Sequence, residues 1–213
     1  MKITLLATSD THGFIEPTNY VDSGLEKPFG IEKACTTIKN YRKAHPNEKI
    51  ILLDNGDFLE GSPMAYYVAK RADKQDQQAF FTAYNEVGYQ LGTIGNHEFD
   101  YGLDYLNYMM KNSDRHFVCA NIVDNNNEPL LADPYTILDV AGVKVGFLGL
   151  TTTSTKKWKN VNDLNDFNLT SELDACKRYV PEMRKKADVV VVVYHGGFER
   201  DHTGNWNDIN LSL

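Results

Sequence analysis

The chain has 213 residues and a mass of 24.1 kDa, which is enough for one large domain or two small ones with a buried core. Apolar residues make up 42% and charged residues 24%, the usual proportions of a globular protein, and this excludes a wholly disordered chain. The net charge of −7 argues against a general nucleic-acid binder, because phosphate backbones are held mainly by Lys and Arg. A small phosphorylated ligand stays compatible with this charge.

Three widely spaced cysteines, Cys35, Cys119 and Cys176, give neither a disulfide framework nor a paired-cysteine zinc signature. Cys119 lies in an apolar run and is expected in the core. The first residues show no signal-peptide pattern, and no apolar run reaches the length of a membrane span. We therefore expect a cytoplasmic protein without membrane contacts, although a removed leader would give the same sequence. The oligomeric state is not predicted.

The first half of the chain alternates short β-branched runs with segments of helical periodicity. Strands are predicted over Ile3–Ala7, Ile50–Leu53, Gly92–Ile94 and Phe117–Asn121. Helices are predicted over Ile31–Arg42, Gln75–Val87 and Leu103–Lys111. This alternation is typical of an α/β sheet.

The second half begins with a predicted hairpin, Tyr135–Val140 and Val143–Leu150, joined by a turn at Ala141-Gly142. A helix is predicted over Glu172–Lys186. The five valines of Val189–Val193 predict a strand that is buried on both faces. Together the two halves predict an α/β sandwich with a mixed sheet.

Chemically active side chains follow four of the predicted strands where each strand ends: Asp10 and His12, then Asp57, then Asn96 and His97, and finally His195. Ligands of α/β sheets bind at the carboxyl ends of strands, so these side chains are expected around one crevice. Oxygen and imidazole-nitrogen donors suit Mn²⁺, Fe or Zn²⁺ better than Ca²⁺.

Each block also has an interpretation without function. Asp10-Thr11-His12 can be a loop with a helix cap, and Gly56-Asp57 is a common turn dipeptide. Asn96 or Asp100 can cap the helix that follows, and His195 can be a buried histidine with satisfied hydrogen bonds. The order of the blocks, each at a strand end, favours a shared site.

The blocks Asp10-x-His12, Gly56-Asp57, Gly95-Asn96-His97-Glu98 and His195-Gly196 resemble those of the calcineurin-like metallophosphoesterases. The segments 6–13 and 95–102 are similar to the 5′-nucleotidase branch. The segment 179–184 resembles the 2′,3′-cyclic-nucleotide 2′-phosphodiesterase/3′-nucleotidase subgroup. The resemblance covers nearly the whole chain and implies a four-layer α/β/β/α sandwich with mixed sheets.

The resemblance also implies a dinuclear centre with two divalent ions of the Mn, Zn, Fe or Co class. Asp57 would bridge the ions, because one carboxylate can offer an oxygen to each. Asp10 and His12 would complete one side, and Asn96 and His195 the other. Two ions held in this way can activate water and neutralise phosphoryl oxygens.

His97 is implied as the general acid over the leaving group, with Asp100 orienting its imidazole. Asn96 and His97 would lie on the phosphate side of the substrate, and the nucleobase site is not predicted. The implied function is a metal-dependent hydrolase of small nucleotides, either 2′,3′-cyclic nucleotides or 3′- and 5′-nucleotides. Alternatives are a nucleotide-sugar pyrophosphatase or another phosphoesterase on the same core, and a non-catalytic binding domain.

One departure from the family concerns a further Gly-His-x-His block, which gives each metal one more ligand. After His195 this sequence has only His202, in Arg200-Asp201-His202-Thr203. We therefore expect residues 1–213 to be a catalytic domain incomplete at its C-terminus, without the nucleotide-recognition domain. Alone it should bind metal poorly, have little activity and leave an unpaired edge beside the valine strand. Phe14, next to the first block, is expected in packing or along the crevice.

Overall fold

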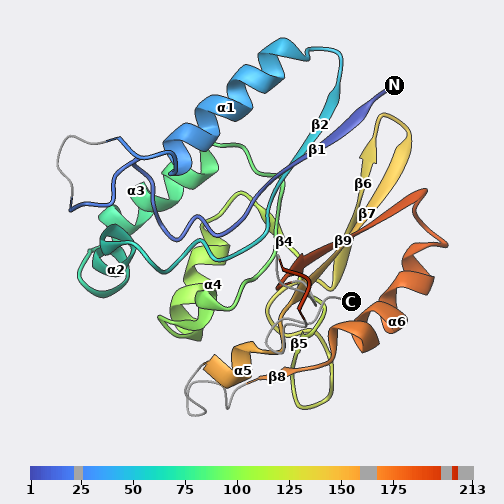
Figure 1. Ribbon diagram of the computed structural model, residues 1–213. Coiled ribbons are helices and arrows are strands. Elements are labelled where there is room, and N and C mark those ends of the chain that lie inside the picture. Colours follow the sequence, from blue (N-terminus) through green and yellow to red (C-terminus); the bar gives the residue numbers. More distant parts are fainter. Residues whose placement is uncertain (22–25, 159–166, 198–202, 206–213) are drawn as a thin grey trace. The chain divides into compact units, whose positions relative to one another are not determined.

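The computed structural model describes residues 1–21, 26–158, 167–197 and 203–205 (Figure 1). His202 and the segment 206–213 lie outside the described residues. The chain divides into two compact units, one formed by residues 1–92 and 97–116 and the other by residues 93–96 and 117–213. Within the described part, no helix combines the length and the apolar character needed to cross a bilayer.

The first unit is built on parallel strands. β1 (Ile3–Thr8) pairs with β2 (Lys49–Asp54), and β2 pairs with β3 (Leu91–Gly92). The two-residue strand β4 (His116–Phe117) follows β3 in the order of the sheet. Ile51, Leu52 and Leu53 of β2 are buried, whereas β1 is an edge strand whose side chains are half-buried or exposed.

Helices α1 (Ile31–Ala44), α2 (Pro63–Lys70), α3 (Lys74–Asn85) and α4 (Leu103–Lys111) belong to this unit, as does the 3₁₀ turn η1 (His97–Phe99). Figure 1 shows α1 alongside β1 and β2. The sequence analysis missed α2. Its start is set by Ser62, whose side chain accepts the N–H of Ala65 at 2.9 Å, and by Pro63 in the first helical turn.

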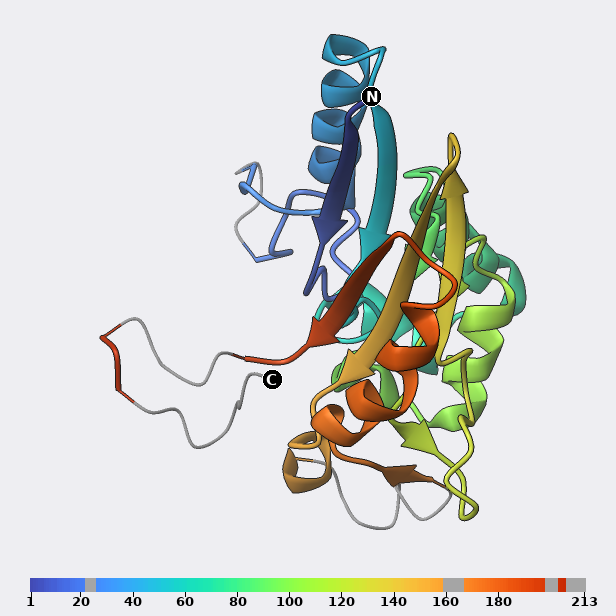
Figure 2. The ribbon, with the colours of Figure 1, turned by 90° about the vertical axis from the view of Figure 1, so that its right-hand side faces the viewer.

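The second unit contains a sheet in the order β6 (Tyr135–Val140), β7 (Val143–Thr151), β9 (Val189–His195). The first pair is an antiparallel hairpin and the second is parallel, and Figure 2 shows β7 between its two partners. Helix α6 (Glu172–Met183) packs on β7 through a core that includes Leu148, Leu150 and Met183. Shorter elements are β5 (Ile122–Val123), α5 (Thr155–Trp158) and β8 (Asn168–Leu169).

Gly149 of β7 shows why one position in this unit admits no side chain. A Cβ built there would lie 1.9 Å from the carbonyl oxygen of Val118. The close approach lets the N–H of Ala120 donate to the carbonyl of Gly149 at 2.8 Å. The segment after Phe117 is therefore fixed beside β7.

The α/β class with parallel and antiparallel pairing is confirmed, but the strand predicted over 117–121 and the burial predicted for the valine strand differ from the expectation. The predicted strand over 117–121 ends at Phe117, because the N–H of Cys119 donates to the carbonyl of Asp133 instead of continuing a ladder. Cys119 is buried, as expected. The predicted burial of the valine strand on both faces is wrong: Val189 is 46% exposed and Val192 40%, since β9 pairs only with β7 among the described strands.

Candidate metal centre

The ends of β1 and β2 lie side by side, and the loops that follow continue this pairing. We call residues 9–13 loop A and residues 55–60 loop B. The last residues of the strands, Thr8 and Asp54, are opposite each other. Beyond them the N–H of Asp10 donates to the carbonyl of Gly56 at 3.0 Å, and the N–H of His12 donates to the carbonyl of Asp57 at 2.8 Å. Backbone hydrogen bonds therefore hold the two loops together.

Three predicted metal ligands have a left-handed backbone. The φ angles are +55° at Asp10, +48° at His12 and +57° at Asp57. Residues with side chains rarely adopt this region, and each instance costs about 1–3 kcal/mol. The bonds between the loops stabilise these conformations. Among the described non-glycine residues of the first unit, only Tyr20, with a φ of +62°, shares this conformation with the three expected ligands.

The ligand atoms of Asp10, His12 and Asp57 lie within 4.8 Å of one another. Two donors on opposite sides of one divalent ion, each about 2.0–2.2 Å from it, would be about 4 Å apart, so the spacing fits such an ion. The His12 Nδ1 atom is 2.6 Å from the carbonyl oxygen of Glu60, so it carries the hydrogen and donates. Nε2 is the ring nitrogen left to face a ligand, and it lies 3.9 Å from the Asp10 carboxylate.

The position of the His12 ring depends on Gly61. A Cβ at this glycine would be 2.7 Å from the His12 Cβ, and Gly61 itself has a φ of +131°. Any side chain there would displace the histidine. The glycine therefore belongs to the support of the ligand set, and the sequence analysis did not identify it.

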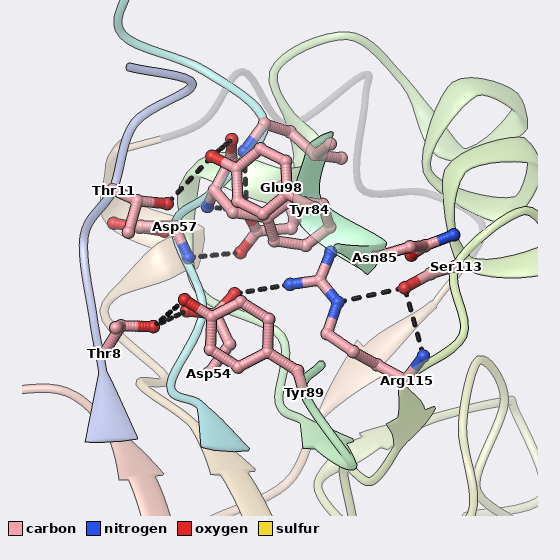
Figure 3. Close-up of polar contacts among 12 residues, drawn as sticks. Thr8, Thr11, Asp54, Asp57, Tyr84, Asn85, Tyr89, Glu98, Ser113 and Arg115 are labelled. Carbon is pink, nitrogen blue, oxygen red and sulfur yellow. Dashed lines mark hydrogen bonds and ion pairs between the residues drawn. The ribbon is translucent and has the colours of Figure 1, made fainter. Parts of the chain in front are cut away.

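Glu98 is a second residue whose role the sequence analysis missed, although it belongs to a quoted motif. Its side chain is fully buried, and its carboxylate accepts the backbone N–H groups of Asp57 at 2.7 Å, Phe58 at 2.7 Å and Leu59 at 3.2 Å (Figure 3). The N–H of His97 in turn donates to the Asp57 carboxylate at 2.8 Å. Residues 97 and 98 thus fix both the backbone and the carboxylate of the expected bridging ligand.

His97 lies beside this cluster, with its ring centroid 5.3 Å from that of His12. Its Nδ1 is 2.6 Å from the Asp100 carboxylate and 3.3 Å from that of Glu60. The predicted His97–Asp100 pair is therefore present as a contact, and Glu60 is an unpredicted second carboxylate. Asp100 does not cap α4, because the N-cap is Gly102 and no side chain bonds there.

The surroundings of His97 offer further polar groups. Glu60, His97 and Asp100 form a second set of possible ligand atoms within 4.8 Å of one another. Burial, reinforced by Glu60 and Asp100, raises the pKa of Tyr101 to about 12, so its phenol stays neutral at physiological pH. Carboxylates at Nδ1 fix the orientation of the His97 ring and leave Nε2 for chemistry.

The remaining predicted ligands, Asn96 and His195, belong to the second unit. Asn96 precedes η1, and His195 is the last residue of β9, opposite Thr151. Both are buried, with 8% and 6% of their surface exposed. His195 ends a strand as expected, whereas Asn96 lies beyond β3, which already ends at Gly92 instead of continuing to Ile94. The role of both residues as ligands stays a prediction.

A cavity of about 710 Å³ opens beside Asp10 and His12 within the first unit. Residues of β1 and α1 form its walls, together with Phe14, which packs edge-on against Phe29 at a centroid distance of 5.0 Å. Its lining is mainly apolar, and Lys33 supplies a cation. Phe14 thus lines a cavity that includes Asp10 and His12 but none of the other predicted site residues, and its place along the predicted crevice stays a prediction.

Comparison with known proteins supports the family resemblance. Residues 60–212 match the family model described as bacterial capsule synthesis protein PGA_cap. The chain is 31% identical over 212 residues to the 2′,3′-cyclic-nucleotide 2′-phosphodiesterase/3′-nucleotidase of Salmonella typhimurium, covering 94% of this chain and 32% of that protein. The chain therefore spans about a third of the length of such curated relatives.

Solved structures agree with this comparison. A Staphylococcus aureus protein assigned as a 5′-nucleotidase, in complex with alpha-ketoglutarate, matches with a TM-score of 0.85 and 34% identity over 96% of this chain and 39% of that one. The calcineurin-like phosphoesterase YfkN of Bacillus subtilis matches with a TM-score of 0.78 and 29% identity over 96% of this chain and 66% of that one. The chain belongs to the family of the PGA_cap model and, with these relatives, to the calcineurin-like metallophosphoesterases of the 5′-nucleotidase and 2′,3′-cyclic-nucleotide 2′-phosphodiesterase group.

Proposed function

We propose that this protein is a metal-dependent phosphoesterase that hydrolyses small nucleotides. The observation that carries the proposal is the cluster of Asp10, His12 and Asp57, with its strained backbones and its ligand atoms within 4.8 Å of one another. Oxygen and imidazole donors without a thiolate suit Mn²⁺, Zn²⁺, Fe or Co²⁺. The members of this family generally use divalent metals, and the identity of the ions here is part of the proposal.

In the proposed centre two ions would be held by Asp57 as a shared ligand, by Asp10 and His12 on one side, and by Asn96 and His195 on the other. When bound, the ions supply activation of water and neutralisation of phosphoryl oxygens. The protein's contribution is to fix the ligands before metal arrives. His12 is oriented by the carbonyl of Glu60, and the Asp57 carboxylate is oriented by the N–H of His97.

His97 is proposed as the general acid, acting through Nε2. Its Nδ1 is held by Asp100 at 2.6 Å, so Nε2 can deliver a proton to the leaving oxygen without reorientation of the ring. Asn96 and His97 would also contact the phosphate. The ordered His97–Asp100 pair favours catalysis over a binding domain, because a non-catalytic domain has no use for an oriented acid.

The substrate class is inferred from the relatives, whose names include 2′,3′-cyclic-nucleotide 2′-phosphodiesterase/3′-nucleotidase and 5′-nucleotidase. We propose 2′,3′-cyclic nucleotides and nucleoside monophosphates as substrates. Residues 1–213 are proposed to form part of one catalytic domain.

The test is a substrate panel on the full-length gene product after chelation, with Mn²⁺, Zn²⁺, Co²⁺ and Mg²⁺ added back singly. Substrates are 2′,3′-cyclic AMP, 3′-AMP, 5′-AMP and a nucleotide sugar, and Asp57→Asn is the control variant. We expect chelation to abolish hydrolysis of a nucleotide and one of the metals to restore it. Hydrolysis that survives chelation, or that persists in Asp57→Asn, would refute the proposal. Exclusive cleavage of the nucleotide sugar would refute the substrate class.

A further inference from the structure

A buried ion pair lies beneath the two loops of the candidate centre. The side chains of Arg115 and Asp54 are only 2% and 1% exposed, and Arg115 Nη1 lies 2.5 Å from Asp54 Oδ2. Arg115 Nε also donates to the hydroxyl of Ser113 at 2.9 Å. The guanidinium is 4.0 Å from the ring centre of Phe58, a residue of loop B (Figure 3 shows the polar contacts).

Stability alone does not explain this pair. Removing two charges from water costs several kcal/mol per ion, and well-packed apolar residues in place of such a pair are often equally stable or more so. Arginine at a buried site offers a rigid, planar set of donors, which fixes geometry. A role in geometry is therefore the better explanation.

The pair contacts the points at which both loops leave the sheet. Asp54 is the last residue of β2, and its other carboxylate oxygen accepts the hydroxyl of Thr8, the last residue of β1, at 2.9 Å. The hydroxyls of Thr8 and Tyr89 are 2.8 Å apart. Loop A begins one residue after Thr8, and loop B begins one residue after Asp54. A shift of the Asp54 carboxylate would therefore move both loops.

The same guanidinium lies 5.3 Å from the ring centre of Tyr84, which contacts the loops from α3. The Tyr84 hydroxyl is 2.9 Å from that of Thr11 in loop A and donates to the carbonyl of Phe58 in loop B at 3.2 Å. Arg115 is thus in contact with a second side chain that bridges the two loops. Arg115 is linked to loop A indirectly, by Asp54 and Thr8 and by Tyr84 and Thr11. It contacts loop B directly at the ring of Phe58.

We propose that Arg115 is a positioning residue for the metal centre: through Asp54 and the rings of Phe58 and Tyr84 it sets the separation of loop A and loop B before any ion binds. This inference rests on the proposed function for its effect on metal binding. Its effect on the loops themselves does not depend on that function.

The experiment uses the full-length gene product in three variants. Arg115→Met removes the guanidinium, and Asp54→Leu/Arg115→Met replaces the whole pair by apolar side chains. Met109→Ala, at a fully buried position of α4, is the control for a loss of stability alone. Thermal unfolding, amide hydrogen exchange of the metal-free protein and Mn²⁺ titration by calorimetry are measured for each.

We expect the backbone amide hydrogens of Asp10 and His12 to exchange faster in Arg115→Met than in Met109→Ala. Each variant is measured at the same number of degrees below its own midpoint of thermal unfolding. Mn²⁺ affinity should fall by about 10–100-fold, which is the usual loss when a residue that supports a metal ligand is replaced. The double variant should regain thermal stability but neither the amide protection nor the affinity. The proposal would be overturned if Arg115→Met and the double variant both kept the amide protection and the Mn²⁺ affinity of the parent protein. If the parent binds none of Mn²⁺, Zn²⁺, Co²⁺ and Mg²⁺, the proposed function fails, and amide protection still decides the role of Arg115.

Discussion

Replacement of Glu98 by Gln tests whether the buried carboxylate holds loop B. The carboxylate accepts three backbone N–H groups, two through one oxygen and one through the other. Gln has a single acceptor oxygen. If that oxygen keeps the bonds to Phe58 and Leu59, the amide NH₂ faces the N–H of Asp57, and two donors meet without an acceptor.

Hydrogen bonds to a charged group contribute about 1.5–3 kcal/mol each, and an unsatisfied buried donor costs about 1–3 kcal/mol. Glu98→Gln loses one such bond, creates one unsatisfied contact and weakens two further bonds. We expect the free energy of unfolding to fall by about 3 kcal/mol. Mn²⁺ affinity should fall as well, because Asp57 loses its backbone anchor.

The assay is urea unfolding followed by circular dichroism, with Mn²⁺ calorimetry at a temperature where all variants are folded. Glu86→Gln, at the exposed C-terminal end of α3, is the matched control, and its free energy of unfolding should stay within about 0.5 kcal/mol of the parent. The reasoning is refuted if Glu98→Gln is as stable as this control and binds Mn²⁺ with parental affinity.

Three further outcomes are expected. In the full-length protein His97→Ala should lower kcat by about 10²–10⁴-fold for nucleotides and less for nitrophenyl esters, with metal content retained; loss of half the metal would instead make His97 a ligand. Asp57→Asn should reduce occupancy of both ions and His12→Ala mainly of one, and atomic absorption showing two ions in Asp57→Asn would contradict the bridge. Burial raises the pKa of Tyr84 and Tyr89 above 10.0, so above about pH 10 the unfolded chain loses protons that the folded chain keeps. The free energy of unfolding should then fall by about 1.4 kcal/mol per pH unit for each tyrosine, and Tyr84→Phe should reduce this slope.

The strand ends that carry Asp10 and Asp57 were predictable, because β-branched runs stopped by polar residues are a local signal. The contact between His97 and Asp100 was expected from the family resemblance and is present at 2.6 Å. The supporting residues carry no local signal. Arg115 lies 61 positions from Asp54 in sequence, and only the folded sheet brings the two together.

The errors have similar causes. The valine strand β9 has the composition of a doubly buried strand, but burial depends on neighbours that a single segment does not specify. Glu60 looks like an ordinary surface glutamate in the sequence, and the motif that contains Glu98 does not say what its carboxylate contacts. Their contacts with loop B and with His97 follow from the 3₁₀ turn after β3 and from the path of loop B, and neither is encoded in residue spacing.

The most direct test of the proposed centre is anomalous diffraction at the manganese edge from crystals of the full-length protein grown with Mn²⁺. The account predicts a peak within ligand distance of Asp10, His12 and Asp57, with His97 unligated. A peak held instead by Glu60, His97 and Asp100, with none at Asp57, would contradict both the assigned ligands and the role of His97 as an acid.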